Sequence, residues 1–338
     1  MAAVARSSPG TKPARQKWSG LARQEARWGL IFLSPWIVGF LAFTAIPMVA
    51  SLVFSFTDFN LLRPGEIHFI GVRNYTRFFH DPITRISALV SLRYAIVAIP
   101  VAILSPIFLS LLLNARNLWL KRLFRTLFFM PSMVPLVSAV YIWQGVLNPE
   151  TGWINRALNS ICLPHWLANL AGQPEWATTA CVRGPDWLNS ITWIYPGLVI
   201  IGLWGVGNMM ILHLAALQGV PTELLEAAKV DGAGPTTVFF RVTLPMITPV
   251  VFYNLVLTSI GIFQYFIIPY ILSNGTGRPG NSTLFYAMHL YREAFSYSDM
   301  GYGSTLAWAL FLAAGVITLI LFGTQRRWVY YAAGEANR

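Results

Sequence analysis

The chain has 338 residues, of which 55% are hydrophobic and only 11% are charged, and its formal net charge is +11. Soluble domains carry about 25% charged residues, so this composition excludes two ordinary soluble domains and indicates a polytopic membrane protein. The positions of the positive charges, described below, also argue against nucleic acid as a partner. The sequence contains no Walker-type phosphate loop and no HExxH, CxxC or GxSxG motif, so we expect no bound ATP, metal or catalytic site on this chain.

Residues 1–28 form a basic segment in which six lysines and arginines are opposed only by Glu25. Pro9, Gly10 and Pro13 disfavour a helix, so we expect a disordered cytoplasmic tail. A cleaved signal peptide is the alternative. The apolar run that follows is too long for one and lacks a small-residue cleavage site, which favours the tail.

Six apolar segments are each long enough to cross a hydrocarbon core about 30 Å thick, which takes about 20 helical residues. These segments are residues 30–56, 94–113, 127–147, 191–217, 247–269 and 305–324. We therefore expect an all-α polytopic fold of about six transmembrane helices, with a membrane domain over 29–325. Prolines within the segments predict kinks that neighbouring helices must accommodate. They are Pro35, Pro47, Pro100, Pro106, Pro131 and Pro135.

The lysines and arginines are distributed unequally between the two sides of the membrane. Fifteen of the 24 fall in the N-terminal tail, the connection after the second segment, loop 219–245 and the C-terminal tail 326–338. The other nine fall in three longer segments, residues 57–93, 148–190 and 270–304. Because loops rich in lysine and arginine stay in the cytoplasm, we expect both termini and loop 219–245 to be cytoplasmic, and the three longer segments to be external.

The second external segment holds both cysteines, Cys162 and Cys181. Outside the cytoplasm a disulfide between them is allowed, and it would close a loop of about 20 residues with a stabilisation of about 3 kcal/mol. Two unpaired thiols are the alternative, and the sequence leaves both open.

Loop 219–245 connects the fourth and fifth apolar segments and contains the pattern of a short helix. Thr222 is a plausible N-cap, and the carboxylate of Glu223 suits a helix N-terminus. The helix should run over 223–230 and end near Gly232, because glycine adopts the left-handed conformation that other residues resist.

A second short helix fits residues 236–243, ahead of Pro245. Helices of this length are not stable alone. The loop therefore either lies on the membrane surface or acts as a lever that docks into a partner's groove. Leu224, Leu225 and Ala228 would form its apolar side.

The order and spacing of residues in this loop resemble the EAA loop of ABC importer permeases. Glu-Ala-Ala at 226–228 is followed after three residues by Gly232, and after nine more by Val-Thr-Leu-Pro at 242–245, where valine replaces the usual isoleucine. In that family the loop lies on the cytoplasmic face and inserts into the ATPase subunit. The resemblance assigns coupling to the following residues: Glu223, Leu224, Leu225, Glu226, Ala227, Ala228, Asp231, Gly232 and Pro245.

Further segments are similar to carbohydrate importer permeases of the maltose and glycerol-3-phosphate type. They are Phe-Ile-Gly-Val-Arg-Asn-Tyr at 69–75, the entry into the third span at 124–131, and residues 281–283, 291–295 and 301–304. The resemblance runs from about residue 30 to residue 325. The chain departs from the family pattern at Ser91-Leu92, at Ser105-Pro106 and in the bulk of its second external segment.

This resemblance implies a prokaryotic inner-membrane complex. Its parts would be this chain, a second permease subunit, two ATPase subunits that carry ATP and Mg²⁺, and an external solute-binding protein. The resemblance implies a sugar or related polyol as the solute, with no cofactor on this chain and ATP hydrolysis on the partner subunits.

Polar residues within the spans are candidates for the solute path, because they are costly in lipid and tend to face a cavity. Sugars are recognised by amides, hydroxyls and aromatic faces. The candidates are Asn208 in the fourth span and Tyr253, Asn254, Ser259, Gln264 and Tyr265 in the fifth. Packing between helices, where Asn and Ser form interhelical hydrogen bonds, is the alternative for each.

Three other classes of membrane protein are alternatives to an importer permease. A secondary, ion-coupled carrier usually needs an intramembrane carboxylate or lysine, and no Asp, Glu or Lys lies deep in a predicted span. Such a carrier would also not explain the spacing in loop 219–245. An intramembrane enzyme is disfavoured because the spans hold no catalytic constellation. A polytopic receptor or scaffold is the third alternative, and the sequence leaves it open.

Overall fold

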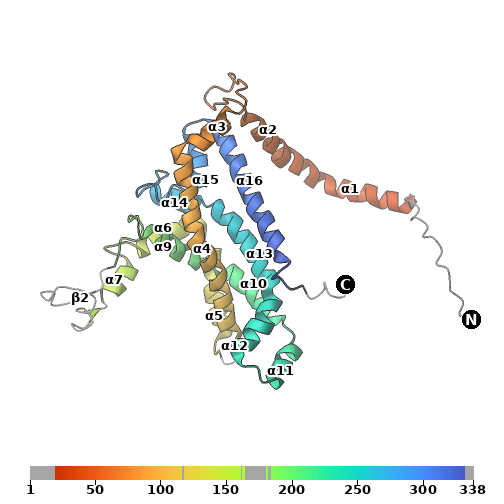
Figure 1. The fold of residues 1–338 in the computed structure, drawn as a ribbon, viewed down its shortest axis with the longest axis vertical. Helices are drawn as coiled ribbons and strands as arrows, with labels where there is room; N and C mark the ends of the chain where they lie inside the picture. Colours follow the sequence, from red (N-terminus) through yellow and green to blue (C-terminus); the bar gives the residue numbers. More distant parts are fainter. Residues whose placement is uncertain (1–19, 116–117, 161, 164–179, 182–183, 332–338) are drawn as a thin grey trace, which may run out of the picture. The chain divides into compact units, whose positions relative to one another are not determined.

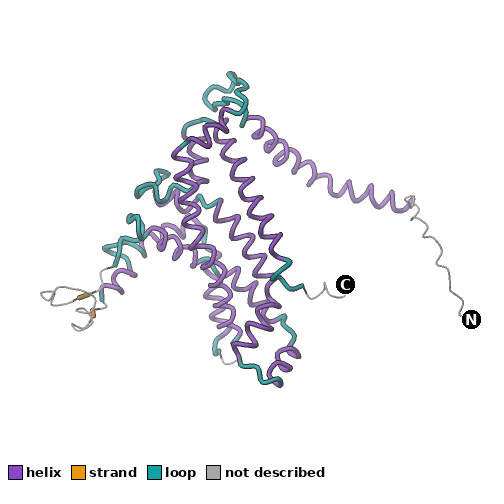
Figure 2. Tube along the Cα trace, in the orientation of Figure 1, coloured by secondary structure: helices purple, strands orange, loops and turns teal. Residues whose placement is uncertain are grey.

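The computed structural model of the protein describes residues 20–115, 118–160, 162–163, 180–181 and 184–331. Within these ranges the regular structure is helical apart from two strands of two residues each (Figure 2). The chain divides into two compact units, Met1–Val53 and Phe54–Arg338, which are taken separately below.

The first unit contains one continuous helical segment. It consists of α1 (Gly20–Phe40), a π-helical turn (Leu41–Ala45) and α2 (Ile46–Phe54). Its stretch Gln24–Phe54 is long and apolar enough to cross a membrane, and its most apolar window has no residue buried within the chain. The predicted first span is therefore present, and Pro35 lies inside α1 without ending it.

The second unit begins with residues 54–81, which together with residues 286–299 form what we call the cap. Its short helix α3 (Arg73–His80) precedes a long helix, α4 (Pro82–Asn114) (Figure 1). The Asp81 side chain caps α4 by accepting a hydrogen bond from the backbone N–H of Ile83 at 2.9 Å, and a proline occupies the first turn. The predicted span 94–113 lies within this helix, which begins 12 residues earlier. Its polar first turns extend beyond the apolar stretch, and capping rather than hydropathy sets where it begins.

Two predicted spans are bent helix pairs. The first joins α5 (Lys121–Phe129) and a short 3₁₀ turn (Met130–Met133) to α6 (Leu136–Val146) with a bend of 106°. Pro131 lies in the 3₁₀ turn and Pro135 precedes α6, so the predicted proline kink is confirmed as a complete break.

The second bent pair is α9 (Ile194–Trp204) and α10 (Gly207–Gln218), which meet at 57°. Gly207 stands where the chain passes close to α5, because a Cβ there would collide with the backbone carbonyl of Phe128. A larger residue at the bend would push the third and fourth spans apart.

The remaining helices complete the unit. They are α7 (Trp153–Asn159), α11 (Thr222–Val230), α12 (Pro235–Val238), a π-helical segment η3 (Phe239–Thr243), α13 (Leu244–Phe263), α14 (Ile267–Ser273), α15 (Tyr286–Tyr291), the π-helical η4 (Arg292–Ser296) and α16 (Met300–Gln325). Among the described residues, four helices can span a membrane, or up to six if each bent pair is one span. The predicted count of about six agrees with the upper figure.

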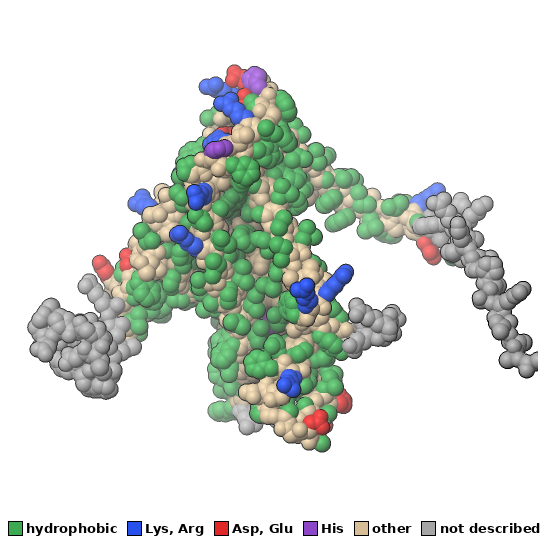
Figure 3. Space-filling model, viewed as in Figure 1, with side chains coloured by type: hydrophobic (Ala, Val, Ile, Leu, Met, Phe, Trp, Pro, Cys, Tyr) green, Lys and Arg blue, Asp and Glu red, His purple; other side chains and the backbone are tan. Residues whose placement is uncertain are grey.

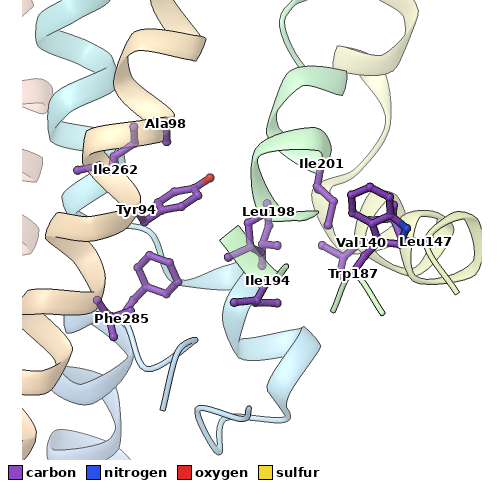
Figure 4. Packing of buried hydrophobic residues seen from close by; sticks show 13 residues of the cluster. Tyr94, Ala98, Val140, Leu147, Trp187, Ile194, Leu198, Ile201, Ile262 and Phe285 are labelled. Carbon is purple, nitrogen blue, oxygen red and sulfur yellow. The ribbon is translucent and has the colours of Figure 1, made fainter. Parts of the chain in front are cut away.

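Helix α4 is the centre of the packing, because α9, α10, α13 and α15 all contact it. The main core cluster joins Tyr94 and Ala98 of α4 to Ile194 and Leu198 of α9 and to Phe285. Figure 4 shows the rings of Tyr94 and Phe285 directed toward Ile194 and Leu198. Hydrophobic side chains also cover much of the visible flank of this unit, whereas charged and histidine side chains gather over the cap (Figure 3). This distribution is that of a helix bundle surrounded by lipid.

Candidate translocation pathway and coupling loop

A cavity of about 260 Å³ lies between α4, α9 and α13. Four side chains with hydroxyl groups line it, namely Tyr94, Ser105, Thr258 and Tyr265, and the other lining residues are aliphatic or glycine. The rings of Tyr94 and Tyr265 stack with centroids 5.0 Å apart and an interplanar angle of 22°. The cavity therefore combines a fixed aromatic wall with scattered hydrogen-bonding groups.

Ser105 and Tyr265 supply the most available of these polar groups. Ser105 Oγ and the Tyr265 hydroxyl are both buried and have no hydrogen-bond partner within the part of the chain that the structure describes. A buried hydroxyl without a partner is destabilising. Their position in the cavity wall therefore suits groups that are satisfied by a transient occupant.

The six predicted path residues lie in different surroundings, and their assignment to the solute path stays a prediction. Only Tyr265 lines the cavity. Asn208, Tyr253 and Gln264 are exposed on the surface of the chain. Asn254 is fully buried and makes contact between helices, donating from Nδ2 to the Ala102 carbonyl at 3.4 Å. Its Oδ1 accepts from Thr258 Oγ1 at 3.0 Å, so Asn254 orients one cavity residue without lining the cavity itself.

Ser259, the sixth predicted path residue, is buried and donates within its own helix to the Leu255 carbonyl at 2.7 Å. The sequence interpretation did not include Tyr94, Ser105 or Thr258. Thr258 carried a usable signal, because it lies four residues after Asn254 and so on the same face of the helix. Ser105 was visible only as a departure from the family pattern.

Loop 219–245 forms a helical hairpin, as predicted. Helix α11 begins at Thr222, with Pro221 in the cap position, so the prediction of Thr222 as a side-chain N-cap was wrong. The helix ends at Val230 with Asp231 as its C-cap, and Gly232 adopts φ +78°, the left-handed conformation that favours glycine. The backbone N–H of Ala233 closes the turn by donating to the Ala228 carbonyl at 2.9 Å.

The apolar side chains of this loop divide between two directions. Leu225 packs inward against the cluster that contains Leu217 and Ile247. Leu224 and Val230 are 45% and 88% exposed, and Glu226 is also exposed. The predicted apolar side is therefore divided: Leu225 attaches the loop to the bundle, whereas Leu224 belongs to the outward surface.

The second arm of the hairpin continues into the fifth span without a break. Helix α12, the π-helical η3 and α13 follow one another directly, and Pro245 lies in the first turn of α13. The backbone N–H of Leu244 bonds to the Phe239 carbonyl, a π-type bond that lets the helix continue next to a residue without an N–H. We expected Pro245 to begin a separate helix, and the structure has one helical body over 235–263 instead.

Segments 57–93 and 270–304, which are predicted to be external, meet in the cap. Asn74 of the Gly-x-x-Asn-Tyr sequence donates from Nδ2 to the carbonyls of Ser55 and Thr57 at 3.1 and 2.9 Å. Gly71 has φ +59°, and Gly301 approaches the chain so closely that a Cβ would collide with the Thr57 carbonyl. These motif residues therefore fold the cap.

The two cysteines lie opposite each other in the only strand pair of the described ranges. Strand β1 (Cys162–Leu163) runs antiparallel to β2 (Ala180–Cys181), with Cys162 as the register partner of Cys181. Directly opposed residues in such a pair have Cα atoms about 4.5 to 5.5 Å apart, within the range that a disulfide requires. The register is compatible with the predicted disulfide, which stays a prediction.

These features define a multi-pass membrane permease: a helix bundle, a partly polar cavity between its helices, and an exposed helical hairpin continuous with one of them. The chain belongs to the family described as binding-protein-dependent transport system inner membrane component, whose model matches residues 98–330. This range includes loop 219–245 and every residue that lines the cavity except Tyr94, so the predicted class is confirmed.

Two curated relatives and one solved structure extend the comparison. The chain is 34% identical to "Probable ABC transporter permease protein YesP" of Bacillus subtilis over 94% of this chain and 97% of that protein. It is 29% identical to "Arabinooligosaccharides transport system permease protein AraP" of the same species, over 90% of each. The fold is similar, with a TM-score of 0.71 and 20% identity, to a chain from the crystal structure of a bacterial ABC transporter involved in the import of the acidic polysaccharide alginate. The match covers 91% of this chain and 99% of that one.

Proposed function

We propose that this chain is one of two permease subunits in an ATP-driven importer of a sugar or related polyol. The cavity carries the proposal: it has a tyrosine wall, hydroxyl groups and no charged side chain among its lining residues, which suits a neutral hydroxylated solute. The transport of arabino-oligosaccharides that the name of AraP states supports the same class.

Two ATPase subunits and an external solute-binding protein complete the proposed complex, with both termini and loop 219–245 in the cytoplasm. The family description itself names dependence on a binding protein, which supports this partner. The exposed hairpin of α11 and α12 supplies the proposed contact with an ATPase subunit, because an amphipathic helix docks through apolar anchors in a groove.

The route from the ATPase to the cavity follows one helical body. A displacement of the hairpin by ATP binding would be carried by α12 and η3 into α13, which lines the cavity with Thr258, Gly261 and Ile262. The Asn254 bond to Ala102 links α13 to α4, which lines the facing wall. If each ATPase conformation binds one conformation of the permease more tightly than the other, ATP hydrolysis would then be coupled to transport.

Uptake into proteoliposomes tests this function. The chain is reconstituted with its partner subunits and binding protein, and uptake of a panel of oligosaccharides is followed with and without ATP. We expect uptake of at least one that depends on ATP and on the binding protein. Uptake driven by an ion gradient without ATP would overturn the proposal in favour of a secondary carrier.

The matched pair Ser105→Ala and Ser110→Ala tests the cavity. Both serines are in α4, but Ser110 is bonded to the Ile107 carbonyl at 2.7 Å and does not line the cavity. Because one neutral hydrogen bond to solute is lost, Ser105→Ala should raise the solute concentration for half-maximal uptake by about twofold to tenfold, and Ser110→Ala should not. Equal behaviour of the two variants would place the solute elsewhere.

A further inference from the structure

At the cap, Arg77 of α3 contacts three side chains that lie more than 200 positions further along the chain. Its Nη1 donates to Asp299 Oδ2 at 2.7 Å and its Nη2 donates to Glu293 Oε2 at 3.0 Å. Its guanidinium carbon lies 3.7 Å from the centroid of the Tyr302 ring. One side chain therefore joins α3 to η4 and to the first turn of α16 by charge-assisted and cation–π contacts.

Thr84, in the first turn of α4, is the second junction. Its hydroxyl donates to Asp81 Oδ2 at 2.8 Å and lies 2.9 Å from the Tyr302 hydroxyl and 3.0 Å from His289 Nε2. The Tyr302 hydroxyl also donates to Asp81 Oδ2 at 3.0 Å. With Arg77, Glu293 and Asp299, these side chains form what we call the Arg77 network.

Burial makes this network costly to disturb. Thr84, His289 and Tyr302 are almost completely buried, with exposed fractions of 3%, 2% and 0%. Burial raises the pKa of Glu293 above its ordinary value despite the nearby Arg77 guanidinium. In such surroundings, polar groups are stable only while their partners stay in place, so the network has one preferred arrangement.

Main-chain contacts reinforce the same assembly. The Tyr286 backbone N–H, which a change of its side chain would leave in place, donates to Ser91 Oγ of α4 at 2.9 Å. The Gly301 N–H donates to the Phe59 carbonyl at 2.9 Å. The cap, the start of α4 and the start of α16 are therefore tied together as one body.

Helix α4 extends from this body to the other end of the unit. Beyond Thr84 it lines the cavity from Tyr94 to Ser105, and its last turns pack through Leu113 against Met210 of α10. Figure 1 shows α4 running from the cap beside α3 toward the end that holds α11 and α12. A shift of the cap would therefore displace the cavity wall, because the two share one helix.

We propose that the Arg77 network is a relay that converts docking of the external solute-binding protein on the cap into movement of α4. Its members are positioning residues, since none of them lines the cavity. The inference rests on the proposed function and assigns a route for stimulation from outside, separate from loop 219–245. The network must stay intact for docking to reach the cavity and, through α13, the ATPase subunits.

The variants Tyr302→Phe and Thr84→Val test the relay. Each removes hydroxyl bonds inside the network and keeps the shape of the side chain. Tyr286→Phe is the matched control, because it also loses one buried tyrosine hydrogen bond at this end but leaves the network untouched. ATP hydrolysis by the reconstituted complex is measured against the concentration of solute-loaded binding protein, together with basal hydrolysis and the melting temperature.

In both network variants we expect the maximal stimulation of ATP hydrolysis to fall about tenfold. Basal hydrolysis and the half-saturating concentration of binding protein should stay close to wild type. Tyr286→Phe should behave as wild type. If only the half-saturating concentration of binding protein changed, the network would be part of the docking surface and the relay proposal would be wrong. An equal loss in Tyr286→Phe, accompanied by a lower melting temperature, would reduce the network to a stabilising role. Absence of stimulation in the wild-type complex would instead contradict the proposed function.

Discussion

The hairpin in loop 219–245 and the Arg77 network lie toward opposite ends of the second unit (Figure 1), and they satisfy their polar groups in opposite ways. In the hairpin, Glu226 and Leu224 are exposed, and the helices are short. In the network, Tyr302 and His289 are buried and every charge has a partner within the chain. The hairpin is therefore suited to receive a partner, whereas the network is suited to move as a unit.

The hairpin and the cap should lie on opposite sides of the membrane, and labelling of cysteines in each should give an all-or-none difference. In a chain with Cys162 and Cys181 replaced, Thr236→Cys should resist an impermeant thiol reagent in intact cells. Glu66→Cys, at an exposed position in the cap, should react. The charge distribution motivates this expectation. Labelling of Thr236→Cys from outside would place the hairpin on the wrong side for an ATPase.

The charge reversal Glu226→Lys should have the largest graded effect. If the ATPase groove is basic at its edge, the change places like charges together, with a penalty of up to several kcal/mol. We expect normal membrane insertion but loss of solute-stimulated hydrolysis in the reconstituted complex. The neutral Glu226→Gln should retain more activity. Stimulation at the wild-type level in Glu226→Lys would exclude this side chain from the coupling contact.

The hairpin was accessible from the sequence because its signals are local. Its helix, turn glycine and spacing all lie within about 25 residues, and short-range rules govern each of them. What local rules missed was the continuity of η3 with α13, since a proline usually indicates a helix start, and here a π-type bond accommodates it.

The network was not predictable from a single sequence. Arg77 and Asp299 are separated by 222 positions, and only the packing of α3 on α16 brings them together. Hydropathy placed six spans and the prolines predicted a kink at Pro131 and Pro135, but neither gave the size of the 106° bend. In the same way, polarity selected Asn208 and Gln264, whose role in the path stays a prediction. It could not select the residues that line the cavity, because which way they face depends on helix rotation.

Gly232→Val tests whether the turn between α11 and α12 aims the hairpin. Open space surrounds Gly232, so its φ of +78° is the only obstacle to a side chain, and a β-branched residue there is strained by about 1 to 3 kcal/mol. We expect stimulated hydrolysis to fall by about tenfold.

Gly234→Ala is the control for this turn. Gly234 also has open space around it, and its φ of −69° is allowed for any residue. Stimulated ATP hydrolysis in Gly234→Ala should therefore equal that of the wild type. If Gly234→Ala and Gly232→Val lost activity equally, bulk near the hairpin rather than turn geometry would be the cause.

The smallest expected effect concerns the pH dependence of the cap. Burial lowers the pKa of His289 below its ordinary 6.5, an effect larger than the attraction of Asp81, and Arg292 and Arg77 act in the same direction as burial. Below pH 6.5 the unfolded chain then binds more protons at this position than the folded one, so stability is lost as pH falls through that value. Glu293, whose pKa is raised, contributes in the opposite direction at lower pH.

We therefore expect the melting temperature of the complex to fall between about pH 7.5 and about pH 5.5, and His289→Gln to flatten this slope while preserving hydrogen bonding to Thr84. His68→Gln is the control, because His68 is exposed in the same cap and lies outside the network. If the slope is unchanged in His289→Gln, another group sets it, and the network is insensitive to external pH. If it flattens, the cap is stabilised by the neutral imidazole, as the buried contacts of His289 require.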